Sequence, residues 1–194
     1  MNGGFEMKRG IQTFLSIVFA IVMLVLFVIF FTKDDSYRYP IALGGFVCAL
    51  VPLILDKFFK IRFTLGFITS YFTFLIGSLC LGSMLRFYNL GWWDTLLHFL
   101  SGTLVAFLAI DLMGKLTTRQ SRSEMSAGFI FLFVLSFGVF CGAIWEIWEF
   151  NMDQFFGTRT QGGGNFDTMT DLIADSIGAL IIAFGFARRT RRNK

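Results

Sequence analysis

Six long apolar runs constrain the fold of this chain more than any other feature of its sequence. Each is about 20 residues long, the length that a helix needs to cross a hydrocarbon layer about 30 Å thick. The runs cover residues 11–32, 41–59, 63–85, 93–113, 127–150 and 170–187. Charged residues make up only 15% of the chain, against about a quarter in soluble domains. The sequence therefore predicts an all-α, polytopic membrane protein, built as a bundle of six transmembrane helices.

The basic residues between these runs predict the orientation in the membrane. Thirteen of the 17 Lys and Arg residues fall in the segments that face the cytoplasm if the N-terminus is inside. Because cytoplasmic loops carry an excess of Lys and Arg, both termini are expected to be cytoplasmic, in a bacterial inner membrane. This placement also accounts for the net charge of +4, so membrane lipid is the expected partner and nucleic acid is not.

The polar residues divide the chain unevenly. We expect a single transmembrane domain over residues 1–194, in which residues 1–89 contain three scaffold spans with few polar side chains beyond Ser and Thr. Residues 90–187 contain the three spans that carry the candidate site. Residues 188–194 form a basic cytoplasmic tail, which we interpret as a topology anchor near anionic lipid.

The chain has no recognised catalytic motif. It lacks an HExxH zinc motif, a Walker phosphate-binding loop and a nucleophile elbow. The three cysteines all lie within apolar runs and share no motif spacing, so we expect buried free thiols: Cys48, Cys80 and Cys141.

Residues 138–178 hold nearly half of the chain's negative charge. Six of the 13 Asp and Glu residues of the chain lie there, in two sets at helical spacing: Glu146, Glu149 and Asp153, then Asp167, Asp171 and Asp175. Each set lies on one face of one helix, with a Gly-rich connection between the two helices. Gly138 and Gly142 continue the first face, a pattern that lets a second helix approach closely.

The fourth apolar run begins with a second polar group. Asp94 and His98 are four residues apart and so share a helix face, which Ser101 and Gly102 continue. His98 is the only histidine of the chain. Taken alone, it is most simply a core histidine that is hydrogen-bonded to a neighbouring acid.

The alternation of spans brings these groups to the same side of the membrane, which is the outer side in the expected orientation. A charge within a span costs about 2.5–3.5 kcal/mol in contact with lipid, so these side chains should face the bundle interior or water. The clustered acids must share protons or bind a cation. Three interpretations stay open: a hydrated structural network, a divalent-metal site, and a pathway for proton or cation transport.

For a metal site, one imidazole with oxygen ligands and no cysteine suits Mg²⁺ or Mn²⁺, and Zn²⁺ is a further candidate. The expected ligands come from three spans: His98, Glu146, Glu149, Asp153, Asp171 and Asp175. Of these, His98, Glu149 and Asp175 are predicted to meet around one cation. The expected supporting residues are Asp94, Gln161, Asp167, Arg86 and Arg159. The two arginines would hold an anionic head group, or simply flank the membrane.

Three motifs carry a resemblance to known proteins. DTLLHFLSG, WEIWEFNMDQFFGTRTQ and DTMTDLIADSIGAL, within about residues 90–180, resemble the YjdF-like family of bacterial inner-membrane proteins. The order of polar residues is also loosely similar to VanZ-like proteins, which are linked to glycopeptide tolerance, although this chain lacks their Asn near the final Asp. The resemblance implies a bacterial membrane protein with six helices and does not specify its chemistry.

These observations favour a metal-dependent membrane enzyme that acts at the outer leaflet on an amphiphilic substrate, such as a phosphate-containing lipid or isoprenoid. Two other functions are compatible with the same residues. One is a transporter of a small ion or metabolite, although the polar stripe is confined to the outer half of the spans. The other is a non-catalytic factor in envelope stress or antibiotic resistance.

Overall fold

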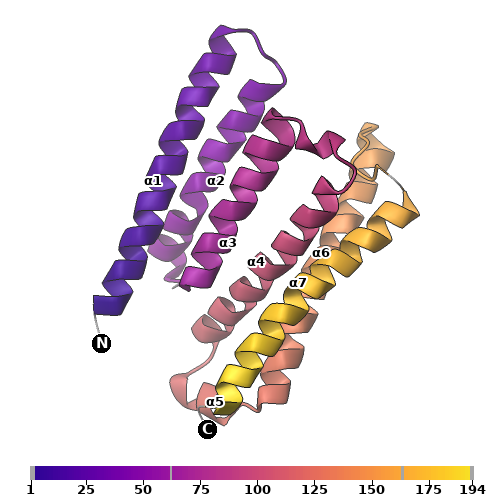
Figure 1. The fold of residues 1–194 in the computed structure, drawn as a ribbon. Coiled ribbons are helices and arrows are strands. Elements are labelled where there is room, and N and C mark those ends of the chain that lie inside the picture. Colours follow the sequence, from indigo (N-terminus) through magenta and orange to yellow (C-terminus); the bar gives the residue numbers. More distant parts are fainter. Residues whose placement is uncertain (1–2, 62, 163, 193–194) are drawn as a thin grey trace. The chain divides into compact units, whose positions relative to one another are not determined.

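The computed structural model describes residues 3–61, 63–162 and 164–192, and within these ranges the chain is helical without strands (Figure 1). The elements in chain order are α1 (Gly3–Thr32), α2 (Arg38–Phe59), α3 (Leu65–Leu75), the π-helix η1 (Ile76–Met84), the 3₁₀-helix η2 (Phe87–Asn89), α4 (Trp93–Leu116), α5 (Arg119–Glu124), α6 (Ala127–Phe156) and α7 (Asn165–Arg192). Among the described residues, six helical segments are long and apolar enough to cross a membrane. The all-α prediction and the six spans are confirmed.

The helices that carry the acidic residues are longer than the apolar runs indicate. Helix α6 continues past residue 150 to Phe156, and α7 begins at Asn165 rather than near residue 170. Polar residues extend both helices, because a helix satisfies its own backbone hydrogen bonds beyond the apolar layer as well as within it. Gly157, with φ of 65°, ends α6 in the left-handed conformation that glycine adopts without strain.

Hydroxyl side chains begin three of the helices. The side chain of Thr64 accepts a hydrogen bond from the backbone N–H of Phe67, and Ser126 does the same for Phe129. Thr118 begins the short helix α5, which lies between the apolar runs 93–113 and 127–150. Each of these residues satisfies a backbone donor that lacks a partner within its helix.

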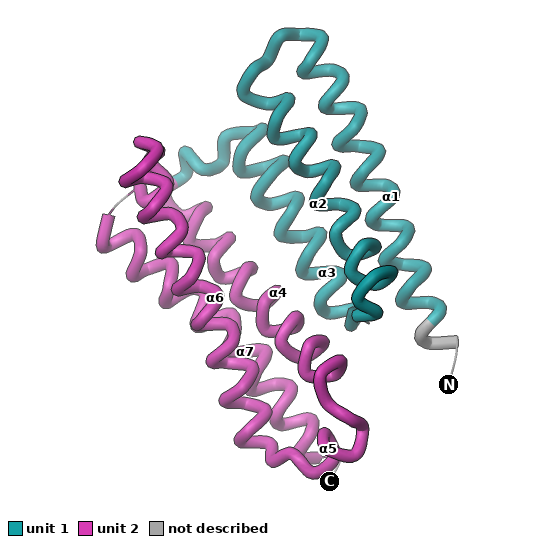
Figure 2. Tube along the Cα trace, turned by 180° about the vertical axis from the view of Figure 1, so that it is seen from behind, with its two compact units in different colours: residues 1–90 teal, residues 91–194 magenta. Residues whose placement is uncertain are grey.

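The chain forms two compact units, residues 1–90 and residues 91–194 (Figure 2). In unit 1, residues 1–90, α1 packs along α2, and α3 continues directly into η1. Met23 of α1 lies against Gly45 of α2, where an added Cβ would be 2.8 Å from the methionine sulfur. The absence of a side chain at Gly45 therefore lets these two helices approach closely.

A proline within α2 is compensated by a tyrosine of α3. Pro52 has no N–H, so the carbonyl of Cys48 lacks its usual donor four residues later. The Tyr71 hydroxyl donates a hydrogen bond to this carbonyl at 2.7 Å. The Gln12 side chain of α1 donates to the carbonyl of Pro52 itself at 3.0 Å. Backbone groups around the proline are thus satisfied from two neighbouring helices, as an apolar environment requires.

In unit 2, residues 91–194, the three long helices α4, α6 and α7 all contact one another. Small and branched side chains fill the core between them, among them Ala106, Ile110, Val134, Ala179 and Ala183. This core supports the end of the unit at which the acidic residues gather.

Glycines allow α7 to pack closely against both neighbours. A Cβ on Gly102 of α4 would lie 2.1 Å from the Asp175 carbonyl oxygen, and one on Gly178 of α7 would lie 2.3 Å from the Phe99 carbonyl oxygen. A Cβ on Gly138 of α6 would lie 2.4 Å from that of Ala179. These distances confirm the close helix approach that the spacing of Gly138 and Gly142 predicts.

The cysteines are free, as expected, but each is half-buried rather than buried: Cys48, Cys80 and Cys141. The tryptophans also differ among themselves. Trp92, Trp145 and Trp148 are exposed, as residues of a membrane interface are, whereas Trp93 is buried in unit 2.

Candidate metal centre

His98 lies at the centre of the acidic end of unit 2. It is on α4, five residues beyond Trp93, and is only 5% exposed. Its Nδ1 atom is 3.0 Å from Oδ2 of Asp175. Its Nε2 atom is 3.8 Å from Oε1 of Glu146 and 3.9 Å from Oδ2 of Asp171. Carboxylates from α6 and α7 therefore approach both edges of the ring.

Asp175 holds the Nδ1 edge of the imidazole. Its Oδ2 faces the ring, and its Oδ1 accepts a very short hydrogen bond from the Ser101 hydroxyl of α4. Gly142 of α6 leaves the room for this carboxylate, since a Cβ there would be 2.7 Å from Oδ2. When the imidazole is neutral, its Nδ1–H donates to Asp175, and the lone pair of Nε2 faces the opposite side.

Two carboxylates beside the Nε2 edge each have one oxygen without a partner. Oε1 of Glu146 and Oδ1 of Asp171 have no hydrogen bond, although the two residues are only 4% and 1% exposed. A buried acceptor without a partner costs about 1–3 kcal/mol, and more when it is charged. Nε2 of His98 lies 3.8 Å from this Oε1 of Glu146 and 3.9 Å from the other oxygen of Asp171, Oδ2, and both distances are too long for hydrogen bonds. They match two ligands of one ion, because bonds of about 2.0–2.2 Å place ligand atoms roughly 3–4 Å apart.

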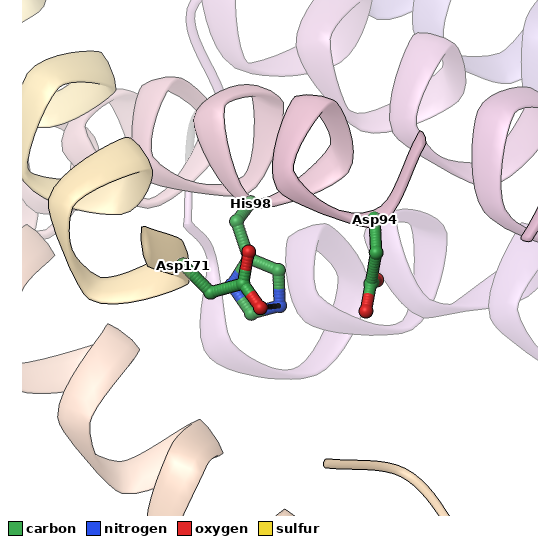
Figure 3. A group of neighbouring side chains, drawn as sticks. All are labelled: Asp94, His98 and Asp171. Atoms are coloured by element: carbon green, nitrogen blue, oxygen red, sulfur yellow. Dashed lines mark ion pairs between the residues drawn. The ribbon is translucent and has the colours of Figure 1, made fainter. Parts of the chain in front are cut away.

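Two further acids complete the group. Asp94, His98 and Asp171 offer ligand atoms within 4.8 Å of one another, and so do His98, Glu146 and Glu149. Figure 3 shows the first of these sets, with His98 and Asp94 on α4 and Asp171 on α7. Glu149 is buried, and its Oε1 accepts a hydrogen bond from the Trp145 indole at 3.0 Å. Asp94 is half-buried and forms the more accessible margin of the group.

The Asp153 carboxylate is occupied by hydrogen bonds from the chain that follows it. Its carboxylate accepts four hydrogen bonds from the connection after α6, donated by Thr158, Thr160 and the backbone of Gln161. It belongs to neither group of potential metal ligands. The Gln161 side chain donates to Thr168 of α7 at 2.7 Å. Asp153 and Gln161 thus fold the connection between α6 and α7 and tie it to the start of α7.

The other predicted supporting residues lie outside the two ligand groups. Asp167 is half-buried in the first turn of α7, one turn before Asp171, where a negative charge is favoured by the helix dipole. Arg159 is exposed in the connection between α6 and α7. Arg86 is exposed and belongs to unit 1.

The group around His98 has a large excess of negative charge. Five carboxylates surround one imidazole: Asp94, Glu146, Glu149, Asp171 and Asp175. In the described ranges of the chain, no Lys or Arg forms an ion pair with any of them. Two ionised carboxylates about 4 Å apart repel by roughly 4 kcal/mol at an effective dielectric constant of 20. The arrangement therefore requires a bound cation or shared protons.

Comparison with known proteins places the chain in a family. Residues 14–192 match the model of a family described as "Predicted membrane protein (DUF2238)". This chain belongs to that family. The DUF2238 match covers all three site-bearing helices, so the His98 group lies within the family's own region.

A protein of Thermotoga maritima, described as "Uncharacterized protein", is similar to part of this DUF2238 chain. The two are 33% identical over 106 residues, which make up 53% of this chain and 52% of that protein. The chain thus matches about half the length of this relative. No solved structure matches the chain. The comparisons therefore identify a membrane protein without indicating its chemistry.

Some functional contacts in this DUF2238 protein were missed by sequence reasoning. The hydrogen bond from Trp145 to Glu149 joins residues four apart on α6, a spacing that the sequence shows but that does not by itself indicate this contact. No spacing in the sequence indicates that Thr168 accepts a hydrogen bond from the Gln161 side chain. It is brought to the site only by the folded connection between α6 and α7.

Proposed function

We propose that unit 2 binds one divalent cation at Nε2 of His98. Glu146 and Asp171 provide the nearest oxygen ligands, and Glu149 and Asp94 lie close enough to complete the coordination. One observation carries this proposal: two buried carboxylates, each with one oxygen that lacks a hydrogen-bond partner, approach Nε2 of His98 to 3.8 and 3.9 Å. One imidazole among several carboxylates suits Mn²⁺ or Mg²⁺ best, with Zn²⁺ as the alternative.

Asp175 serves a different purpose in this proposal. Its two oxygens are already used by His98 and Ser101, so it orients the imidazole rather than binding the ion. A carboxylate on the far nitrogen of a metal-binding histidine fixes the tautomer and raises the basicity of the ligand. This assignment replaces the sequence-based expectation that Asp175 is itself a ligand.

We further propose that the cation serves an enzymatic reaction on a phosphate-containing lipid or isoprenoid. A divalent ion bound largely by carboxylates can polarise a phosphoryl oxygen or activate a water molecule. The ligands lie near the ends of apolar spans, so the head group of an amphiphile can reach them while its chain stays in the bilayer. The exposed Arg159 in the adjacent connection supplies a positive charge for that head group.

The basic-residue bias supports an outward-facing site in a bacterial inner membrane, with both termini in the cytoplasm. The resemblance to YjdF-like and VanZ-like proteins agrees with a role at the cell envelope. Under this orientation the substrate is a lipid of the outer leaflet.

Metal binding can be tested separately from catalysis on the purified protein in detergent. Chelator should lower the melting temperature, and Mn²⁺, Mg²⁺ or Zn²⁺ should restore it. At 100 times the Kd, one site contributes about 2.7 kcal/mol, which corresponds to roughly 5–10 °C for a chain of this size. Native mass spectrometry should show one bound ion per chain.

Two variants identify the ligands. Glu146→Gln and Asp171→Asn each remove a ligand together with a source of repulsion, so both should equal or exceed wild-type stability in chelator and ignore added metal. Asp153→Asn is the matched control, because it removes an acid of α6 outside the ligand groups and should keep the metal response. A wild-type protein that carries no metal and ignores both chelator and metal would refute the metal site in favour of a proton-sharing network.

The enzymatic step has its own test. The metal-loaded protein should release phosphate from a polyprenyl phosphate, a polyprenyl diphosphate or phosphatidic acid, and Asp171→Asn should abolish the release. If metal binds but none of these substrates turns over, cation flux into proteoliposomes tests the transport alternative.

A further inference from the structure

The C-terminal end of α7 carries a second charged feature, at the opposite end of the helix from the acids. Gly185, Arg188, Arg189 and Arg192 line a hollow with a volume of about 350 Å³. Their spacing of three, four and seven residues places them on one face of the helix. All three arginines are exposed, and an added Cβ on Gly185 would meet no atom within 4 Å. The hollow exists because glycine leaves a gap between three cationic side chains.

The hollow continues an apolar face that is open to the outside of the protein. Ile181 and Ile177 precede Gly185 by four and eight residues and are 53% and 45% exposed. On the other side of this part of α7, Ala183 and Ala187 are buried in unit 2. One outward stripe of the helix thus changes from isoleucine to arginine where the apolar span ends.

We propose that this hollow binds the phosphate head group of an anionic phospholipid, whose acyl chains lie along Ile181 and Ile177. Arginine pairs with phosphate through two parallel hydrogen bonds, which makes such contacts stronger than those of neutral donors. Cationic residues just beyond a membrane span attract anionic lipid head groups. The arginines of the stripe lie at the membrane surface and the isoleucines lie below them, just as the charged head group of a phospholipid lies at the surface and its acyl chains lie below.

The lipid site is independent of the His98 group. It uses no carboxylate and lies at the other end of α7, so the loss of either site leaves the other intact. Its charge complements a phosphate group, and the adjoining apolar stripe distinguishes a membrane lipid from a free phosphate ion. A lipid should therefore bind much more tightly than its soluble head group.

Delipidated protein in detergent, titrated with phosphatidylglycerol and followed by native mass spectrometry, tests the site. Phosphatidylglycerol should bind and raise the melting temperature, whereas phosphatidylcholine, glycerol phosphate and inorganic phosphate should have little effect. Arg188→Gln, Arg189→Gln and Arg192→Gln should each weaken binding about five-fold, since each basic residue at the surface contributes about 1 kcal/mol.

Two further variants separate a specific site from general charge attraction. Arg191→Gln removes the same charge from the same turn without lining the hollow, so it should bind phosphatidylglycerol as wild type does. Gly185→Leu fills the hollow, keeps every charge and should weaken binding. The proposal is overturned if Arg191→Gln weakens binding as much as the three other substitutions, if Gly185→Leu has no effect, or if glycerol phosphate or inorganic phosphate binds as well as the lipid.

Discussion

The imidazole of His98 has a hydrogen-bonded edge and an open edge. On the Nδ1 edge, Asp175 is itself held by the Ser101 hydroxyl. On the Nε2 edge, Glu146 and Asp171 stand too far away for hydrogen bonds and keep oxygens without partners. The proposed metal site rests on this difference, because a metal-binding histidine has one nitrogen held by a carboxylate and the other facing the ligand group.

The first prediction concerns Asp175. Asp175→Asn should weaken Mn²⁺ binding by about 10–100-fold, because the neutral amide orients the imidazole less firmly and lowers its basicity. Ser101→Ala should weaken it less, since the carboxylate stays in place. The Kd for Mn²⁺, measured by electron paramagnetic resonance, provides the comparison.

The same measurement distinguishes orientation from coordination. In Asp175→Asn, the spectrum of bound Mn²⁺ should show the wild-type ligand set at a higher metal concentration. A changed ligand set in this variant would make Asp175 a ligand and refute the orienting role.

Spacing along each helix predicts which residues share the site, but not which atoms meet. The four-residue intervals from Asp94 to His98 and from Asp171 to Asp175 correctly place both pairs near the ring. The rotation and height of three helices decide which nitrogen each acid faces, and spacing alone leaves these free. Spacing also does not show that hydrogen-bond donors of the next connection occupy the carboxylate of Asp153.

At the scale of the helix, glycines control how closely α7 approaches α4. Gly102→Ala should destabilise the protein by about 1–3 kcal/mol or more, because its Cβ would lie 2.1 Å from a backbone oxygen that cannot move aside alone. Metal binding should also weaken, since that oxygen belongs to Asp175. Gly185→Ala in α7 is the control: its Cβ meets open space, so it should be neutral or slightly stabilising. Thermal unfolding in detergent measures the stability of both variants, and an equal loss of stability in the two would contradict the packing argument.

The Tyr71 hydroxyl gives a second prediction at this scale. Tyr71→Phe leaves the Cys48 carbonyl without a donor and should cost about 1 kcal/mol of unfolding free energy. In the Pro52→Ala background the same change should cost less, because the alanine would supply the missing N–H from within α2. A double-mutant cycle of unfolding free energies measures the difference. Equal costs in both backgrounds would show that the tyrosine does not compensate for the proline.

The helices themselves were largely predictable, since apolar runs of the right length specify spans. The residues at which the helices begin and end were less predictable. The extension of α6 to Phe156 lies beyond the apolar run, where its mixture of polar and apolar residues gives no clear hydropathy signal. The wider turns of η1, from Ile76 to Met84, also leave no trace in the hydrophobic pattern, because every residue of that segment is apolar or small.

For the whole molecule, the distribution of basic residues predicts both termini in the cytoplasm. In a variant whose three native cysteines are replaced, Arg159→Cys should react with a membrane-impermeant maleimide added to intact cells. Arg119→Cys should react only after the membrane is permeabilised. The opposite labelling pattern would contradict this orientation and would show that the acidic site lies on the cytoplasmic side.

The depth of His98 along α4 has an electrical consequence. Five residues beyond Trp93 correspond to about 7–8 Å, roughly a quarter of a hydrocarbon layer about 30 Å thick. A divalent ion that reaches this depth crosses about a quarter of the membrane potential. The electrical free energy of this movement is about 1 kcal/mol per 100 mV. With the site outside and the interior negative, polarising a proteoliposome by about 100 mV should tighten cation binding several-fold. The energised membrane would then help to load the site, and a depolarised cell would tend to empty it.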